Sequence, residues 1–216
     1  MRITLIRHGE SMANIKQHDY SAVGDHMVPL TERGVYQAQV AGNMLGDELQ
    51  DALDGKTLVY CSPYLRTRQT LENMFIGAYL KDRPTIYEDP RLRETDHGYE
   101  GASEQKPLRA IHGWFYYRYR GGESPADCSD RVSNYLESMM RQRKRKGAEN
   151  IVIVSHGLTI RCFLMRFMHL KVEEFEKLAN PDNCDIITIG LKETIADPTH
   201  TCGRWAMTGI KERKQR

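Results

Sequence analysis

The clearest indication of the fold lies at the start of the chain, in Met1-Arg2-Ile3-Thr4-Leu5-Ile6-Arg7-His8-Gly9. Its apolar run, from Ile3 to Ile6, has the length of one buried β-strand and is too short for a helix. The stretch Ile151-Val152-Ile153-Val154-Ser155-His156-Gly157 has the same design, an apolar strand that runs into His-Gly. In open α/β sheets, ligands bind beyond the carboxyl ends of the strands. The sequence therefore predicts a sheet in which two strands each carry a histidine to the ligand-binding edge.

The composition is typical of one globular domain with a sizeable core. Of 216 residues, 28% are charged and 40% are hydrophobic, and the net charge of +2 gives no overall field for nucleic acid or anionic membranes. No apolar stretch approaches the roughly 20 residues of a membrane span, and the first strand begins too early to leave room for a signal peptide. The five cysteines contain no C-x-x-C pair, so we expect reduced thiols and a cytoplasmic location.

Strand-like and helical segments alternate along the chain. Helices are expected after Thr31, Ser62-Pro63, Ser124-Pro125 and His156, and over 103–119; strands are expected at 3–6, 57–61, 85–87, 151–155, 185–191 and 203–208. This alternation predicts an α/β three-layer sandwich with a mostly parallel central sheet, an antiparallel edge strand and helices on both faces. No linker divides the chain, so residues 1–216 are expected to form a single domain, with a helical cap segment at about 103–146 over the carboxyl edge of the sheet.

Four cationic or imidazole side chains converge if the strands run parallel. Arg7, His8 and His156 follow two of the strands, and Arg66 lies in the first turn after a third. The planar fork of arginine suits phosphate oxygens better than lysine does, and the backbone N–H groups at the helix start near Gly157 add donors. A tetrahedral dianion uses this many donors more fully than a carboxylate, so the sequence predicts a phosphoryl ligand and a small phosphorylated substrate.

A histidine in such a site can act as a nucleophile. Neutral imidazole attacks phosphorus with one nitrogen while the other nitrogen donates a hydrogen bond that fixes the ring. The cations then neutralise the charge on the phosphoryl oxygens. Because the leaving alkoxide needs a proton, a carboxylic acid is expected nearby. Glu94 is the candidate for this role, and Asp96 is its competitor.

The sequence Arg7-His8-Gly9-Glu10-Ser11, with Asn14, resembles the R-H-G-E-x-x-x-N signature of the histidine phosphatase superfamily, in its phosphoglycerate mutase-like branch. The resemblance extends through five further stretches in order: Pro29-Leu30-Thr31-Glu32-Arg33-Gly34, Ser62-Pro63-x-x-Arg66-Thr67-x-Gln69-Thr70, Arg91-Leu92-x-Glu94, Gly122-Glu123-Ser124 and Ser155-His156-Gly157. It implies the same α/β sandwich and a reaction that needs neither metal nor cofactor.

The resemblance also implies a role for each matching residue. His8 is the phosphorylated nucleophile, and Arg7, Arg66 and His156 clamp the phosphoryl group. Asn14 contacts the phosphate, and Glu94 is the proton donor and later the base for water. A turn-capping role for Asn14 and a structural salt bridge for Glu94 are the alternatives from the residues themselves.

Two departures favour hydrolysis over mutase activity. Phosphoglycerate mutases carry tryptophan where this chain has Ala13, and they have a longer, basic insertion between Glu94 and His156. The segment Phe115 to Arg120 with Gly121-Gly122-Glu123-Ser124 looks like small phosphatase relatives instead. The prediction is therefore a phosphomonoesterase. A cofactor-dependent phosphoglycerate mutase and a non-catalytic regulator that binds a phosphorylated partner are the alternatives, and a homodimer is compatible with the sequence.

The segment from Trp114 to Arg120 has two interpretations. Its aromatic side chains either pack in the core or line a pocket for an apolar or aromatic leaving group, with Tyr117, Arg118 and Arg120 at the rim. Gly122-Glu123-Ser124 either touches the phosphoryl site or provides a helix cap at Ser124.

Overall fold

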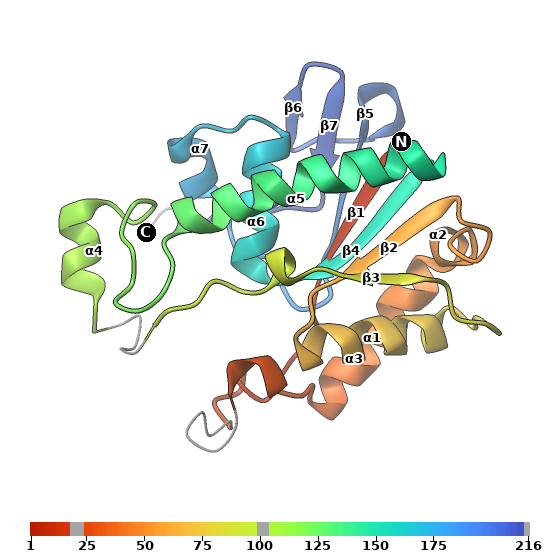
Figure 1. Ribbon diagram of the computed structural model, residues 1–216, viewed down its shortest axis with the longest axis horizontal. Coiled ribbons are helices and arrows are strands. Elements are labelled where there is room, and N and C mark those ends of the chain that lie inside the picture. The colour runs from red at the N-terminus through yellow and green to blue at the C-terminus, as the bar shows by residue number, and fades with distance from the viewer. Residues whose placement is uncertain (18–23, 99–103, 214–216) are drawn as a thin grey trace.

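A single mixed sheet forms the centre of the computed structural model, which describes residues 1–17, 24–98 and 104–213 (Figure 1). The strand order is β3-β2-β4-β1-β5-β7-β6. The first four of these strands are parallel, and β5, β7 and β6 are antiparallel to their neighbours. The strand bounds are β1 Arg2–Arg7, β2 Thr57–Cys61, β3 Ile86–Glu88, β4 Asn150–Ser155, β5 Ile186–Leu191, β6 His200–Cys202 and β7 Trp205–Thr208.

Helices cover both faces of this sheet (Figure 1). One face carries α1 (Glu32–Met44), α2 (Gly46–Gln50) and α3 (Leu65–Gly77); the other carries α5 (Pro125–Lys146), α6 (Gly157–Phe167) and α7 (Val172–Lys177). The short helix α4 (Lys106–His112) lies at the edge of the molecule, on the side where α5 begins (Figure 1). Three 3-10 turns complete the described elements: η1 (Asp25–Met27), η2 (Pro90–Leu92) and η3 (Lys192–Thr194). The predicted α/β sandwich is therefore confirmed.

The strand sequences alternate between two hydrophobic cores, as successive side chains of a strand must. In β4, Ile151 and Ile153 pack under α5 and α6, whereas Val152 and Val154 pack against α1 and α3. All four side chains are fully buried, which is why the strand is apolar without interruption. Among the described residues, no helix has both the length and the hydropathy of a membrane span.

The expected helix over 103–119 is wrong beyond His112. Gly113 adopts a φ of 82° and ends α4, and residues 114–119 form a loop whose aromatic rings anchor it instead. The hydroxyl of Tyr117 donates to Oε1 of Gln105 at 2.9 Å, and Phe115 and Tyr117 are buried. Aromatic residues that bury their rings from a loop carry no helical period, so the sequence pattern was misleading there.

Two other expectations differ in detail. Ser62 is not an N-cap, because α3 begins at Leu65 after Tyr64 and Ser62 has a different partner, described below. Helix α5, which was expected as part of a cap, packs over a face of the sheet through Val132 and Tyr135 instead. Strand β6, α2 and α7 were not predicted, since each is short and shows little periodicity.

Candidate active site

The two histidines lie side by side at the carboxyl ends of neighbouring strands. β1 and β4 pair in parallel with Arg7 opposite Ser155, so His8 and His156 leave the sheet at the same level. Their ring centroids are 5.3 Å apart, with an interplanar angle of 62°. Both side chains are buried, with exposed fractions of 4% and 0%. The register of the sheet alone is enough to bring these distant positions together.

Hydrogen bonding fixes the tautomer of His8. Its Nδ1 lies 2.7 Å from the carbonyl oxygen of Gly9, which can only accept, so Nδ1 carries the proton and Nε2 keeps its lone pair. The N–H of Gly9 donates to Oγ1 of Thr70 at 3.0 Å. A Cβ at position 9 would approach the carbonyl oxygen of Gly34 to 2.5 Å, so only glycine fits here. The His8-Gly9 pair is thus held rigidly, with one free imidazole nitrogen.

The electrostatic environment keeps His8 neutral. Burial, followed by the positive charges of Arg66 and Arg7, lowers the pKa of His8 to about 3. At neutral pH the ring is therefore uncharged, which is the form that can act as a nucleophile.

Arg66 is held by an ion pair that the sequence did not indicate. Its Nη1 donates to the backbone oxygen of Asp25 at 2.7 Å and to Oδ1 at 3.1 Å, and its Nη2 donates to Oδ2 at 3.2 Å. The Arg66 guanidinium also lies 4.9 Å from the centroid of the Tyr64 ring. These contacts fix the plane of the guanidinium while its Nε–H and one Nη2–H remain for another acceptor.

Arg7 is held by a backbone carbonyl group. Its Nη1 donates to the carbonyl oxygen of Pro181 at 2.7 Å. Burial lowers the pKa of Arg7, and the carboxylate of Glu94 partly offsets that effect. The Nε of Arg7 is buried and has no hydrogen-bond partner.

His156 has a partner on one nitrogen only. Its Nε2 lies 2.8 Å from Oγ of Ser62, whereas its Nδ1 is buried without a partner. Burial and then Arg66 lower the pKa of His156 well below its usual value. Unpaired buried polar atoms are rare in proteins and need an explanation. An anion that accepts from Nδ1 of His156 and Nε of Arg7 would satisfy both.

Glu94 is half-buried at the edge of this cluster. Its Oε1 accepts from the backbone N–H of Thr95 at 3.0 Å and from the hydroxyl of Thr159 at 3.4 Å. Asp96 is exposed, and its Oδ1 accepts from the N–H of Gly98 at 2.8 Å in a local turn. Of the two carboxyl groups, Glu94 is therefore the one that faces the cationic cluster, since its charge acts on Arg7.

Asn14 makes the bonds of a turn. Its Oδ1 accepts from the N–H of Ser11 at 3.0 Å and from Nδ2 of Asn183 at 3.3 Å. Asn183 also donates to the carbonyl oxygen of His8 at 3.0 Å, so Asn14 is linked to the histidine segment. Because Oδ1 is used in this way, the Nδ2 of Asn14 is the atom that remains to contact a phosphate.

Gly157 starts α6 directly after His156, which has no side-chain cap bond. The N-terminus of this helix therefore faces the site with free backbone donors. A Cβ on Gly157 would meet Cγ of Asn180 at 3.2 Å, so the position is tight.

Sequence reasoning missed several supporting residues: Asp25, Ser62, Thr70, Thr159 and Asn183. Ser62 lies within a stretch that was recognised, but its hydroxyl was assigned to a helix cap. Thr70 lies in the same stretch but was given no role of its own. Asp25, Thr159 and Asn183 come from separate elements and carry no local signal, because a polar residue that supports a site has no period of its own.

The segment around Gly122 does not touch the phosphoryl cluster. Glu123 forms ion pairs with Arg93 and Arg131, and Ser124 caps α5 through a capping box with Asp127. Among the residues that the structure describes, no group of three His, Cys, Asp or Glu side chains could hold a metal ion.

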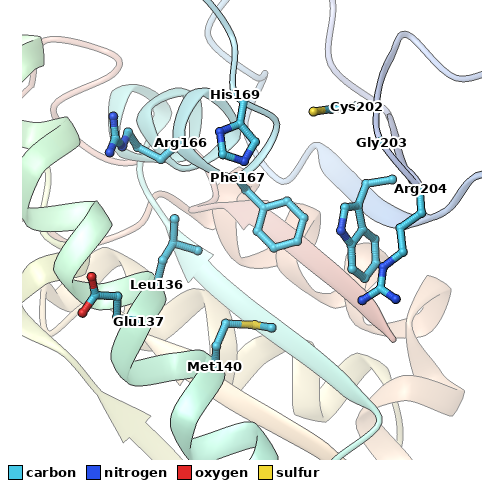
Figure 2. A pocket seen from close by; sticks show the side chains of 10 residues that line it. Leu136, Glu137, Met140, Arg166, Phe167, His169, Cys202, Gly203 and Arg204 are labelled. Carbon is cyan, nitrogen blue, oxygen red and sulfur yellow. The ribbon is translucent and has the colours of Figure 1, made fainter.

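A groove of about 630 Å³ lies apart from the histidine cluster, between α5, the end of α6 and the β6–β7 hairpin (Figure 2). The rings of Phe167 and Trp205 make an edge-to-face contact with centroids 5.4 Å apart, and Arg204 lies over the Trp205 ring. None of the residues that line the groove belongs to the histidine cluster, so the groove plays no part in the chemistry below.

The fold and the buried cationic cluster together define an α/β enzyme with a site for an anionic group. The model of the histidine phosphatase superfamily (branch 1) matches residues 3–197. The chain belongs to this superfamily and is an enzyme of the phosphatase class.

Three similar proteins illustrate the relationship. Phosphoglycerate mutase-like protein AT74H of Arabidopsis thaliana is 41% identical over 201 residues, which cover 85% of this chain and 72% of the relative. Broad-range acid phosphatase DET1 of Saccharomyces cerevisiae is 25% identical, with 89% and 86% covered. A mycobacterial glucosyl-3-phosphoglycerate phosphatase has the same fold, with a TM-score of 0.69 at 22% identity and with 96% and 97% of the two chains covered.

Proposed function

We propose that this chain is a phosphomonoesterase that hydrolyses a small phosphorylated metabolite through a phosphohistidine intermediate on His8. The observation that carries the proposal is the state of His8: a neutral ring whose Nδ1 is bonded to Gly9 and whose Nε2 is free, next to Arg7, Arg66 and His156. A site that only binds phosphate needs cations, but it does not need a tautomer-fixed imidazole with a free lone pair.

The phosphoryl group of the substrate is bound by the donors that the protein leaves unused. These are the Nε–H and the remaining Nη2–H of Arg66, the Nε–H of Arg7, Nδ1 of His156 and the N–H of Gly157. In this scheme the hydroxyl of Ser62, 2.8 Å from Nε2 of His156, donates to that nitrogen, and Nδ1 of His156 carries the hydrogen that the anion accepts. Asn14 adds a donor through Nδ2.

In the first step, Nε2 of His8 attacks phosphorus and the bond from phosphorus to the ester oxygen breaks. The carboxyl group of Glu94 gives its proton to the departing alkoxide. The two arginines stabilise the charge that spreads over the phosphoryl oxygens in the transition state. The products of this step are the free alcohol and phospho-His8.

In the second step, the carboxylate of Glu94 takes a proton from water, and the water oxygen attacks phosphorus. The bond from phosphorus to Nε2 breaks and returns the lone pair to His8. Inorganic phosphate leaves, and Glu94 is again protonated for the next cycle. The same residue thus serves as acid and then as base, as microscopic reversibility allows.

Two relatives with phosphatase names support hydrolysis: the broad-range acid phosphatase of Saccharomyces cerevisiae and an acid phosphatase of Mycobacterium tuberculosis. The test is release of inorganic phosphate from a broad panel of phosphorylated metabolites, with His8→Ala as the inactive comparison and His200→Ala, on the edge strand β6, as the matched control. We expect turnover by the parent chain and by His200→Ala but not by His8→Ala. Retained activity in His8→Ala, with the fold verified by circular dichroism, would contradict the mechanism.

A mutase is the second candidate because the Arabidopsis relative is named phosphoglycerate mutase-like. Incubation with a phosphoglycerate, with and without a bisphosphate primer, separates the two reactions. Free phosphate without isomer formation supports the phosphatase, and isomer without free phosphate supports the mutase. No reaction with any phosphoester would leave a phospho-ligand-binding regulator as the function.

Metal independence and location are also part of the proposal. Vanadate should inhibit competitively, as a mimic of the pentacoordinate phosphoryl group, and chelators should leave the rate unchanged, unlike in a metallophosphatase. The five unpaired cysteines support a cytoplasmic location, which a fluorescent fusion would test.

A further inference from the structure

A second cavity, of about 210 Å³, opens beside Glu94, and neither His8 nor His156 is among its lining residues. Its lining includes Glu94, Arg109, Trp114, Tyr119, Arg161 and Arg213. Glu94 comes from the segment after η2, and the other residues come from α4, the loop after α4, α6 and the last described segment of the chain.

Three guanidinium groups lie around the same indole ring, that of Trp114. The Cζ atoms of Arg161 and Arg213 each lie 5.0 Å from the ring centroid, and that of Arg109 lies 5.8 Å away. Stacking on an aromatic face leaves the edge of a guanidinium, with its N–H groups, directed sideways. The pocket is therefore lined by arginine donors as well as by the aromatic rings of Trp114 and Tyr119.

No carboxylate among the described residues forms a salt bridge with any of these three arginines. Arg161 is only 1% exposed; it donates to the carbonyl oxygen of Phe175 and to Oδ1 of Asn180, while its Nε is buried without a partner. The Nε of Arg109 is also buried and unpartnered. Burial, and then repulsion from Arg213, lowers the pKa of Arg161 to about 9. Like charges confined in this way are stabilised when an anion joins them.

Glu94 connects this pocket with the phosphoryl cluster. It lines the pocket, and its carboxylate acts electrostatically both on Arg7 of the cluster and on Arg161 of the pocket. In the proposed mechanism Glu94 protonates the leaving oxygen, and the rest of the leaving group must continue past it. The pocket is therefore where the alcohol portion of the substrate would lie.

We propose that the pocket formed by Arg109, Arg161 and Arg213 around Trp114 binds a second anionic group of the substrate, a carboxylate or a phosphate on the leaving alcohol. The proposal rests on the function proposed above and deepens it. The substrate class is then phosphomonoesters of small hydroxy acids or of phosphorylated alcohols, rather than esters of neutral alcohols.

The test compares phosphate esters that differ only at the far end of the leaving group. One series consists of O-phosphorylated ω-hydroxy acids with increasing numbers of methylenes, a second consists of the matched ω-diols, and a third consists of α,ω-bisphosphates. At the best chain length we expect kcat/KM for the carboxylate or bisphosphate to exceed that for the diol by about tenfold or more, as charge-assisted arginine contacts imply. Comparison of the first and third series identifies which anion the pocket prefers.

Arg109→Gln and Arg213→Gln should each lower this ratio of anionic to neutral substrate by about tenfold. Arg161 also bonds to the backbone at Phe175, so its loss would disturb the fold and it is not used as the primary variant. Arg204→Gln is the matched control, because Arg204 stacks on Trp205 in the distant groove (Figure 2). A ratio near one at every chain length, or a ratio that Arg109→Gln and Arg213→Gln leave unchanged, would overturn the proposal.

A binding measurement separates this proposal from the proposed function. The chain has two tryptophans, so Trp205→Phe leaves Trp114 as the single tryptophan, which can be excited at wavelengths that tyrosine does not absorb. We expect non-hydrolysable ω-phosphonocarboxylates to change Trp114 emission at lower concentration than alkylphosphonates do, and Arg109→Gln to remove the difference. If this holds while no ester is hydrolysed, the phosphatase mechanism fails and the anion pocket stands. If esters are hydrolysed but the two phosphonates bind alike, the pocket proposal fails.

Discussion

His8 is a neutral imidazole in a strongly positive environment. A charged imidazolium at this position would meet both the cost of burial and the repulsion of Arg66 and Arg7. A dianionic phosphoryl group reverses that balance, because its charge compensates the arginines. The residue is thus prepared for a ligand that brings negative charge, which is the condition for attack on a phosphate ester.

Glu94→Gln should separate the acid role from the base role. With alkyl phosphates, whose alkoxide needs a proton, we expect phosphoryl transfer to fall by about 10²–10⁴-fold. With p-nitrophenyl phosphate, whose leaving group needs no proton, the first step should persist as a burst, and only the later steady rate should fall. Stopped-flow absorbance measures both phases.

Asp96→Asn is the matched control for that experiment, because Asp96 is the exposed carboxylate two residues away. It should leave both phases unchanged. Equal losses with both leaving groups in Glu94→Gln, or a comparable loss in Asp96→Asn, would remove Glu94 from the acid–base role.

Among single residues, the placement of His8, His156, Arg7 and Arg66 at the carboxyl edge of the sheet could be predicted from the sequence. Each of these residues lies at the end of a strand or at the start of a helix. Ser62 shows where that reasoning ended. A serine before proline is a good helix cap in general, but here the hydroxyl bonds to His156 across 94 positions of sequence. No local pattern records such a contact.

Helix α5 is the element that sequence signals defined best. The hydroxyl oxygen of Ser124 accepts from the backbone N–H of Asp127, and the carboxylate of Asp127 accepts from the backbone N–H of Ser124. Pro125 occupies the first turn of the helix. At the other end, Gly147 adopts a left-handed φ of 67°. The start of this helix was predicted from Ser124-Pro125 because capping chemistry is local. The false helix over 114–119 had no such caps, which is the physical reason that the pattern failed there.

Ser124→Ala should lower the free energy of unfolding by about 1 kcal/mol, the usual value of an N-cap. Ser133→Ala is the matched control, since Ser133 lies inside the same helix and its hydroxyl only donates to the carbonyl oxygen of Ser129. Urea denaturation of the two variants gives the comparison. Equal stabilities would mean that the capping box contributes nothing to α5.

In the whole molecule, two hydrophobic cores stabilise the fold, whereas burial of the polar carboxyl edge of the sheet costs free energy. The cores on either face of the sheet provide the apolar burial that stabilises the fold. At the carboxyl edge, His8 and His156 are buried without charge. Acid therefore destabilises the fold, because the unfolded chain protonates these rings at a higher pH than the folded chain does.

The stability of the fold should consequently fall as the pH is lowered. His8 takes up a proton near its usual pKa of about 6.5 when unfolded, but only at about 3 when folded. Between these values the unfolded state binds more protons, so the free energy of unfolding decreases by about 1.4 kcal/mol per pH unit for each such histidine. Urea denaturation at pH 7, 6 and 5 measures the slope.

His8→Gln should make that slope shallower, and His200→Gln should leave it unchanged. Added phosphate or vanadate should raise the stability of the parent chain at each pH, since it binds only the folded state. An identical slope in the parent chain and in His8→Gln would mean that the ring of residue 8 is accessible to protons in the folded protein.

The most direct measurement is the identification of the phosphorylated atom in the Glu94→Gln variant. After a burst with p-nitrophenyl phosphate, the intermediate should persist, because water lacks its base. Alkaline quenching and mass spectrometry should find one phosphoryl group that is stable in alkali and lost in acid, on the peptide that contains His8. A phosphoryl group on any other residue, or a full burst with no modified peptide, would contradict the account.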